Sequence, residues 1–198
     1  RDQGWDIENF IGKIGDSDLK GKIRIDLSGK QTFVKADLLS KKIDLDDFGP
    51  MLGIAPDTGP GETASPAQQR EAKKQAASKF SLPTKPIDFK KLENIHVDIK
   101  LTSSTIKTDL PIDNLTTHVI IQNGHLTLSP LNFGVADGKI SSHVEIDARA
   151  KPVQTKVETE IRHLRLKQIL KKWDISADSA GLIGGKAIYW LKGNSLAD

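Results

Sequence analysis

The chain has 198 residues, no cysteine, and a net charge of +3 that is the difference between 29 basic and 26 acidic residues. The lack of cysteine excludes disulfides, thiol catalysis and cysteine-based zinc sites, and the interspersed charges disfavour a nucleic-acid binder, whose basic residues gather on one face or tail. A hydrophobic content of 37% suffices for a folded core, and no apolar run approaches the ~20 residues of a membrane-spanning helix.

The first predicted element is a short amphipathic helix over residues 7–14. Its apolar residues follow the i, i+3, i+4, i+7 spacing of one helix face: Ile7, Phe10, Ile11 and Ile14. The same spacing returns in residues 45–52 and 166–173. The sequence therefore predicts three short helices of one kind.

A strand pair is predicted between the first two helices. Residues 23–27 alternate apolar and polar side chains, residues 28–30 have turn composition, and residues 32–41 form the return strand. Ile25-Asp26 recurs as Ile146-Asp147 at a constant offset, so a strand–strand–helix module is repeated. We assign residues 1–53 to the first module.

Residues 54–87 break this pattern. Prolines and glycines mark a linker, and a polar helix is predicted within it after Ser65. Its apolar face is mostly alanine, which is typical of an exposed insertion.

The third region, residues 88–198, is predicted as an antiparallel sheet module. Alternation predicts strands at 95–101, 139–148 and 153–161, followed by the helix at 166–173. The last strand, 181–191, has no further strand after it and is expected at an exposed edge.

Asn123-Gly124 fixes a hairpin within this region, because this dipeptide favours a two-residue turn. In the resulting register Val119 faces Leu128 and Ile121 faces Leu126. His118 and the other polar side chains lie on the opposite face. One apolar and one wet face are typical of an antiparallel sheet that is covered on one side.

These elements predict a mostly β (α+β) fold: a twisted antiparallel sheet of about eight strands with short amphipathic helices. Two interpretations of its apolar face remain. The helices cover it completely, or three short helices are too few and part of the sheet is an open groove for lipid or protein.

No reactive constellation accompanies this scaffold. His118 and His125 share a face but lie about 13 Å apart, at ~3.3 Å per residue, which is too far for one metal ion. Asp44, Asp46 and Asp47 lack the remaining ligands of a calcium loop and are expected to cap a helix. We expect no catalytic residue, metal or cofactor.

Several segments of the chain together match the pattern of a known family. These segments are Gly21–Gly29, Ala36–Ser40, Ile43–Gly53, Asn123–Phe133, Asp137–Lys139 and Gly193–Asp198. On these segments the chain resembles the AsmA family of bacterial envelope proteins. The resemblance covers most of the chain outside the linker, and its motifs are apolar patterns rather than reactive groups.

The resemblance implies a non-enzymatic periplasmic segment, tethered to the inner membrane by an anchor outside these residues. Its partners would be phospholipid or another acyl-chain lipid, bound along an apolar β-groove for outer-membrane biogenesis, and no nucleic acid. The alternative is a scaffold that binds an envelope protein partner and assists outer-membrane protein assembly. The candidate lipid-contacting residues are Ile95, Val97, Ile99, Leu101, Val119, Ile121, Leu126, Leu128, Val144, Ile146, Val153 and Val157.

Overall fold

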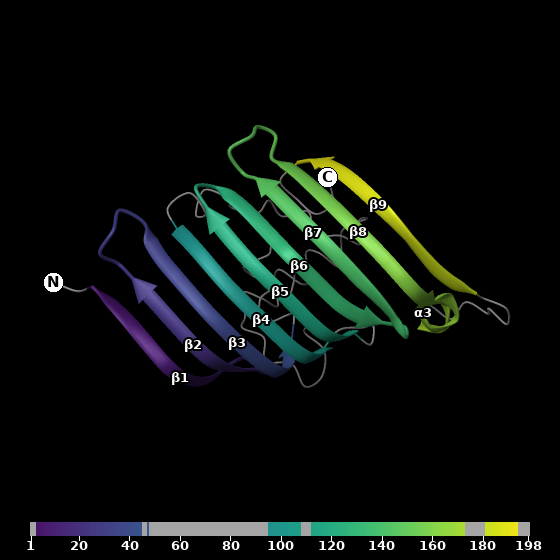
Figure 1. The fold of residues 1–198 in the computed structure, drawn as a ribbon, viewed down its shortest axis with the longest axis horizontal. Helices are drawn as coiled ribbons and strands as arrows, with labels where there is room; N and C mark the ends of the chain where they lie inside the picture. Colours follow the sequence, from purple (N-terminus) through teal and green to yellow (C-terminus); the bar gives the residue numbers. More distant parts are fainter. Residues whose placement is uncertain (1–2, 45–46, 48–94, 108–111, 173–180, 194–198) are drawn as a thin grey trace, which may run out of the picture.

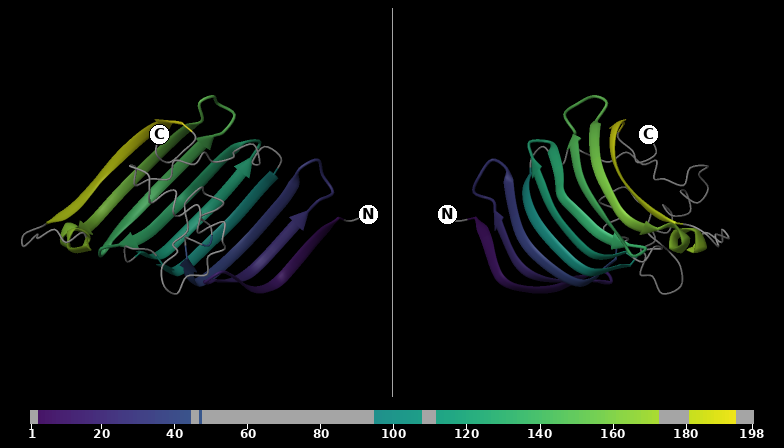
Figure 2. Two further views of the ribbon diagram at one scale, coloured as in Figure 1. Left: turned by 180° about the vertical axis from the view of Figure 1, so that it is seen from behind. Right: turned by 45° about the vertical axis from the view of Figure 1, so that its right-hand side comes forward.

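The computed structural model describes residues 3–44, 47, 95–107, 112–172 and 181–193. They form one open nine-stranded sheet whose strands neighbour each other in chain order (Figure 1). Figure 2 shows that the sheet is twisted and that its strands are bent. The elements are β1 (Gly4–Ile14), β2 (Ser17–Asp26), β3 (Thr32–Asp44), β4 (Ile95–Lys107), β5 (Ile112–Gln122), β6 (His125–Val135), β7 (Gly138–Asp147), β8 (Gln154–Arg165), α3 (Leu166–Lys172) and β9 (Leu182–Lys192).

The sheet is mixed rather than wholly antiparallel. β3 and β4 pair in parallel, while every other neighbouring pair is antiparallel. A parallel pair needs a connection of a dozen or more residues to return the chain to the same end of the sheet. Residues 45–94 provide that length, whereas the other strands follow one another through shorter connections.

The helix predicted over residues 7–14 was wrong, because these residues belong to β1. Ile7 pairs with Ile23, and Phe10 pairs with Gly21 after a register shift between Ile7 and Phe10. Such a bulge inserts an extra residue, so apolar residues three apart fall on one face of a strand. The helical spacing and the bulged strand therefore have the same sequence pattern here, and β-branched residues favour the strand.

The predicted hairpin register is confirmed. Val119 pairs with Leu128, and Ile121 with Leu126. Asn123 and Gly124 have φ values of 50° and 74°, as a type I′ turn requires. The other predicted strands are confirmed, and the last of them, β9, pairs with β8 and forms one edge of the sheet.

One of the three predicted repeat helices is confirmed, as α3. The helix predicted over 45–52 and the linker 54–87 lie outside the described residues, apart from Asp47.

The buried core lies toward the end of the sheet where α3 begins. One apolar cluster centres on Ile43, Ile106 and Leu115. A second centres on Val135, Ala136 and Leu164, and Ile169 of α3 packs against it. Each such side chain contributes about 1.5–3 kcal/mol on full burial. The core is thus concentrated at one end of the strands.

Candidate functional site

Two rows of apolar side chains cross the whole sheet on one face. Successive residues in each row are direct partners on neighbouring strands, so they share that face. The first apolar row is Trp5, Ile25, Val34, Val97, Ile121, Leu126, Ile146, Thr155 and Leu191. The second apolar row is Ile7, Ile23, Ala36, Ile99, Val119, Leu128, Val144, Val157 and Tyr189.

These rows are separate from the two core clusters, which contain none of their residues. Most central members are half-buried, and Val97 and Ala36 are buried. At the two sheet edges the rows are open to solvent: Trp5 is 59% exposed and Leu191 is 53% exposed. Among the described residues the one helix, α3, packs on the core rather than on the rows.

The rows contain nine of the twelve predicted site residues: Val97, Ile99, Val119, Ile121, Leu126, Leu128, Val144, Ile146 and Val157. Ile95 and Leu101 flank them on the same face of β4, and Leu101 packs against the first core cluster. Val153 precedes β8 and is only 9% exposed. Contact of any of these residues with lipid stays a prediction.

Sequence reasoning missed the ends of both rows. Ile7 was assigned to a helix face, and Ile23 and Ile25 were predicted in a strand but not joined to the site. Tyr189 and Leu191 were likewise left out. On β2 the signal was the same alternation that identified the central strands. β9 has no such signal, because Ile188, Tyr189, Trp190 and Leu191 are apolar in a row.

The opposite face is charged and solvated. Asp98 accepts a hydrogen bond from His118 at 2.7 Å, which is the main cause that lowers the pKa of Asp98. His143 Nε2 donates a hydrogen bond to Glu145 Oε1 at 3.0 Å, and this bond is the main cause that lowers the pKa of Glu145. Within the described ranges, no group of three His, Cys, Asp or Glu side chains is placed to hold a metal ion.

The arrangement is therefore a sheet with an apolar strip on one face and a charged opposite face. Nine strands at a spacing of ~4.8 Å make the strip about 38 Å long, and the two rows lie about 7 Å apart along each strand. A continuous, partly exposed apolar surface of this size is typical of a binding site. No helix in the described part of the chain is long and apolar enough to cross a membrane.

The fold and strip define an open β-sheet protein with an extended apolar face. The profile of the AsmA family matches residues 3–196, so the chain belongs to the AsmA family, a bacterial envelope family not known for enzymatic activity. AsmA family protein YhjG of Escherichia coli (strain K12) is 31% identical over 198 residues, a match that covers 98% of this chain and 28% of YhjG. The chain thus spans less than a third of that relative's length. No solved structure matches it.

Proposed function

We propose that this chain is a non-enzymatic periplasmic segment of an envelope protein that binds or conducts phospholipid acyl chains along its apolar strip during outer-membrane biogenesis. The observation that carries the proposal is the continuity of the two apolar rows across all nine strands. Membership of an envelope family supports it. An inner-membrane tether outside these residues is part of the same proposal.

The mechanism would be passive. Each methylene group that leaves water for an apolar surface gains about 0.8 kcal/mol, so an extended chain gains from every strand it crosses. Thr155 is the one polar residue in either row, so few positions would interrupt the path of an acyl chain along the strip. An acyl chain that crosses the strands meets similar side chains at each strand. It can therefore move along the strip without a deep minimum in its binding free energy.

The experiment is lipid mass spectrometry on the chain purified from a bacterial envelope without detergent. Two double variants of β9 provide a matched pair. Tyr189→Asp/Leu191→Asp places charges on the apolar face, while Ile188→Asp/Trp190→Asp places them on the opposite face of the same strand. The four replaced side chains have comparable exposures of 49%, 53%, 50% and 70%.

We expect stoichiometric phospholipid in the parent chain and in Ile188→Asp/Trp190→Asp. Tyr189→Asp/Leu191→Asp should lose more than half of it, because a carboxylate next to an acyl chain loses its hydration. A folded, lipid-free parent chain would overturn the proposal.

The alternative function, a protein-interaction scaffold for outer-membrane protein assembly, rests on the edge strand. β9 exposes large apolar side chains on both faces, and an edge strand can receive a partner strand by backbone pairing. Under this alternative both β9 variants would lose a protein partner that remains bound to the parent chain after lipid extraction.

A further inference from the structure

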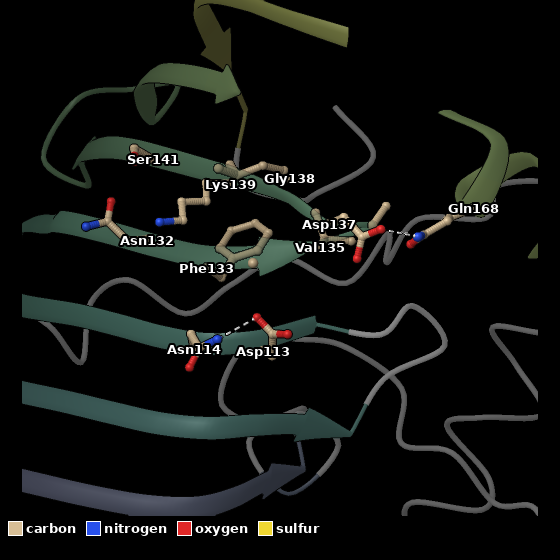
Figure 3. A pocket seen from close by; sticks show the side chains of 13 residues that line it. Asp113, Asn114, Asn132, Phe133, Val135, Asp137, Gly138, Lys139, Ser141 and Gln168 are labelled. Carbon is tan, nitrogen blue, oxygen red and sulfur yellow. Dashed lines mark hydrogen bonds between the residues drawn. The ribbon is translucent and has the colours of Figure 1, made fainter. Parts of the chain in front are cut away.

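A pocket of about 550 Å³ lies where β5, β6 and β7 reach α3 (Figure 3). Its apolar lining residues Phe133, Val135 and Ile140 also belong to the second core cluster. Its volume is within the range of small-ligand sites. Apart from Ala136 and two glycines the remaining lining is polar, so the pocket differs in kind from the apolar strip.

Three donor side chains in this pocket are free. Asn132 pairs with Ser141 in the β6–β7 ladder, and Lys139 lies two residues from Ser141 on the same side of β7. Figure 3 shows the Lys139 side chain extended toward Asn132, with Ser141 beside them. Within the described part of the chain, none of the three side chains has a hydrogen bond or an ion pair. An ammonium, an amide and a hydroxyl thus lie together without an acceptor.

A second cation lies beside this group. Lys139 is the direct partner of Arg162 across the β7–β8 ladder. Like charges at directly opposite positions of a ladder are destabilising. Arg162 Nε donates a hydrogen bond to Glu160 Oε1 at 2.7 Å, so the Lys139 ammonium is the positive charge of this pair that lines the pocket. A bound anion would relieve this repulsion.

The other side of the pocket carries a carboxylate. Asp113 of β5 pairs with Gly134, which in turn pairs with Lys139, so the acid and the lysine face each other across a glycine. A Cβ at position 134 would overlap the Asp113 carboxylate, so glycine there leaves the space that the acid occupies. Asp113 Oδ1 accepts a hydrogen bond from Asn114 Nδ2 at 2.9 Å. The second carboxylate of the pocket, Asp137, is held by Gln168 at 2.6 Å and Arg165 at 3.1 Å.

We propose that this pocket binds a phosphate group that carries an ammonium group, as in a phosphoethanolamine. Lys139, Asn132 and Ser141 would hold the phosphate oxygens by charge-assisted hydrogen bonds, and Asp113 would hold the ammonium. The same chemistry occurs in a soluble phosphoethanolamine and in a phospholipid headgroup. The lipid source rests on the function proposed above, whereas the pocket chemistry does not.

Calorimetric titration of the 198-residue chain at low salt tests the pocket, with O-phosphoethanolamine, inorganic phosphate and ethanolamine as probes. We expect O-phosphoethanolamine to bind more tightly than either fragment. Lys139→Gln should weaken its binding at least tenfold, and Lys100→Gln, at an exposed position on the same charged face of β4, should not. Asp113→Asn should remove the preference over inorganic phosphate while retaining phosphate binding.

Absence of O-phosphoethanolamine binding at millimolar concentration would overturn the proposal, and so would equal effects of Lys139→Gln and Lys100→Gln. A short-chain phosphatidylethanolamine below its micelle concentration then identifies the source. If it binds more tightly than O-phosphoethanolamine, the ligand is a lipid, and if it does not, the ligand is a soluble phosphoethanolamine. If O-phosphoethanolamine binds while no lipid copurifies with the chain, the pocket stands and the lipid function fails.

Discussion

Lys107 Nζ lies 2.8 Å from Asp44 Oδ2, at the last residue pair of the parallel β3–β4 ladder. The Asp44 side chain is only 2% exposed, and the Lys107 side chain is 35% exposed. The Asp44 backbone N–H also donates to Ser17 Oγ at 2.9 Å. Asp44 therefore connects the ends of β3 and β4 through its carboxylate, and connects them to the start of β2 through its backbone N–H, next to the first core cluster.

Replacing Lys107 with methionine should lower the free energy of unfolding by about 2–3 kcal/mol. Breaking a fully buried ion pair costs ~3–5 kcal/mol because a buried charge loses its counter-charge, and the partly exposed lysine places this pair somewhat below that range. Urea unfolding followed by circular dichroism measures the change.

The control is the double variant Lys107→Met/Asp44→Leu, which removes the carboxylate together with its partner. It should be more stable than Lys107→Met alone, because the buried carboxylate is removed together with the ammonium that faces it. Asp16→Asn, which removes an exposed partner 3.3 Å from the same ammonium, should cost less than about 1 kcal/mol. A Lys107→Met variant as stable as the parent would contradict this account.

Replacing Gly138 with alanine should destabilise the sheet by about 2–3 kcal/mol. A Cβ at this position would lie 2.7 Å from Leu164 Cα and 2.8 Å from Arg162 O, and backbone atoms cannot move aside as side chains do. The cost of such overpacking is typically ~1–3 kcal/mol. Thermal or urea unfolding checks the value.

Gly185→Ala is the matched control for Gly138→Ala. Gly185 lies on the edge strand β9, and no atom is within 4 Å of the position its Cβ would take. Alanine should be neutral there, or stabilising by up to ~1 kcal/mol through the lower entropy of the unfolded chain. Equal destabilisation by both substitutions would show that close approach at Gly138 is not the cause.

Asp147 gives the sheet a dependence on acid pH. Hydrogen bonds from the Arg149 side chain are the main cause that lowers the pKa of Asp147 from 3.8 to about 2. Because the folded-state pKa is depressed, the contribution is complete above about pH 4 and is lost as the pH falls through 2. The Asp147 side chain is 34% exposed, so solvent screening limits the contribution to about 1 kcal/mol.

Asp147→Asn should therefore lower the stability at pH 7 by up to about 1 kcal/mol, and by much less at pH 2, where the carboxylate of the folded chain is about half protonated. Urea unfolding of Asp147→Asn and of the parent chain at pH 7, 4 and 2 measures this difference. A constant difference at all three pH values would mean that the carboxylate charge is not responsible.

The local part of this fold was predictable from the sequence. Asn123-Gly124 determines its own turn geometry, and strict alternation on each side determines which residues share a face. Ile7 and Phe10 misled because one inserted residue in a strand imitates helical spacing, and only the partner strand β2 distinguishes the two. The parallel pairing of Thr32 with Ile95 joins residues separated by the whole linker, so no local pattern encodes it.

The pocket was hidden for a related reason. Asp113 and Lys139 come together because Gly134 lies between them in the sheet. To predict this arrangement, one would need to know the complete registers of the β5–β6 and β6–β7 ladders. Both ladders contain register shifts that the turn residues do not predict. Alternation identifies faces, but it does not identify which positions meet across an irregular ladder.

Leu128 and Thr127 are adjacent on β6 and point to opposite faces, so they separate a lipid-binding face from an ordinary core. Leu128 pairs with Val119 and Val144, whereas Thr127 pairs with Ile120 and Glu145. Leu128→Asp should remove most copurified phospholipid while the far-ultraviolet circular dichroism stays that of the parent chain, since a carboxylate at a half-buried position on an open face keeps part of its hydration. Thr127→Asp should retain both the lipid and the spectrum. If Leu128→Asp unfolds the chain and Thr127→Asp does not, the centre of the strip is packed core, and the solvent-exposed β9 pair Tyr189→Asp/Leu191→Asp then decides whether the edge of the strip binds lipid.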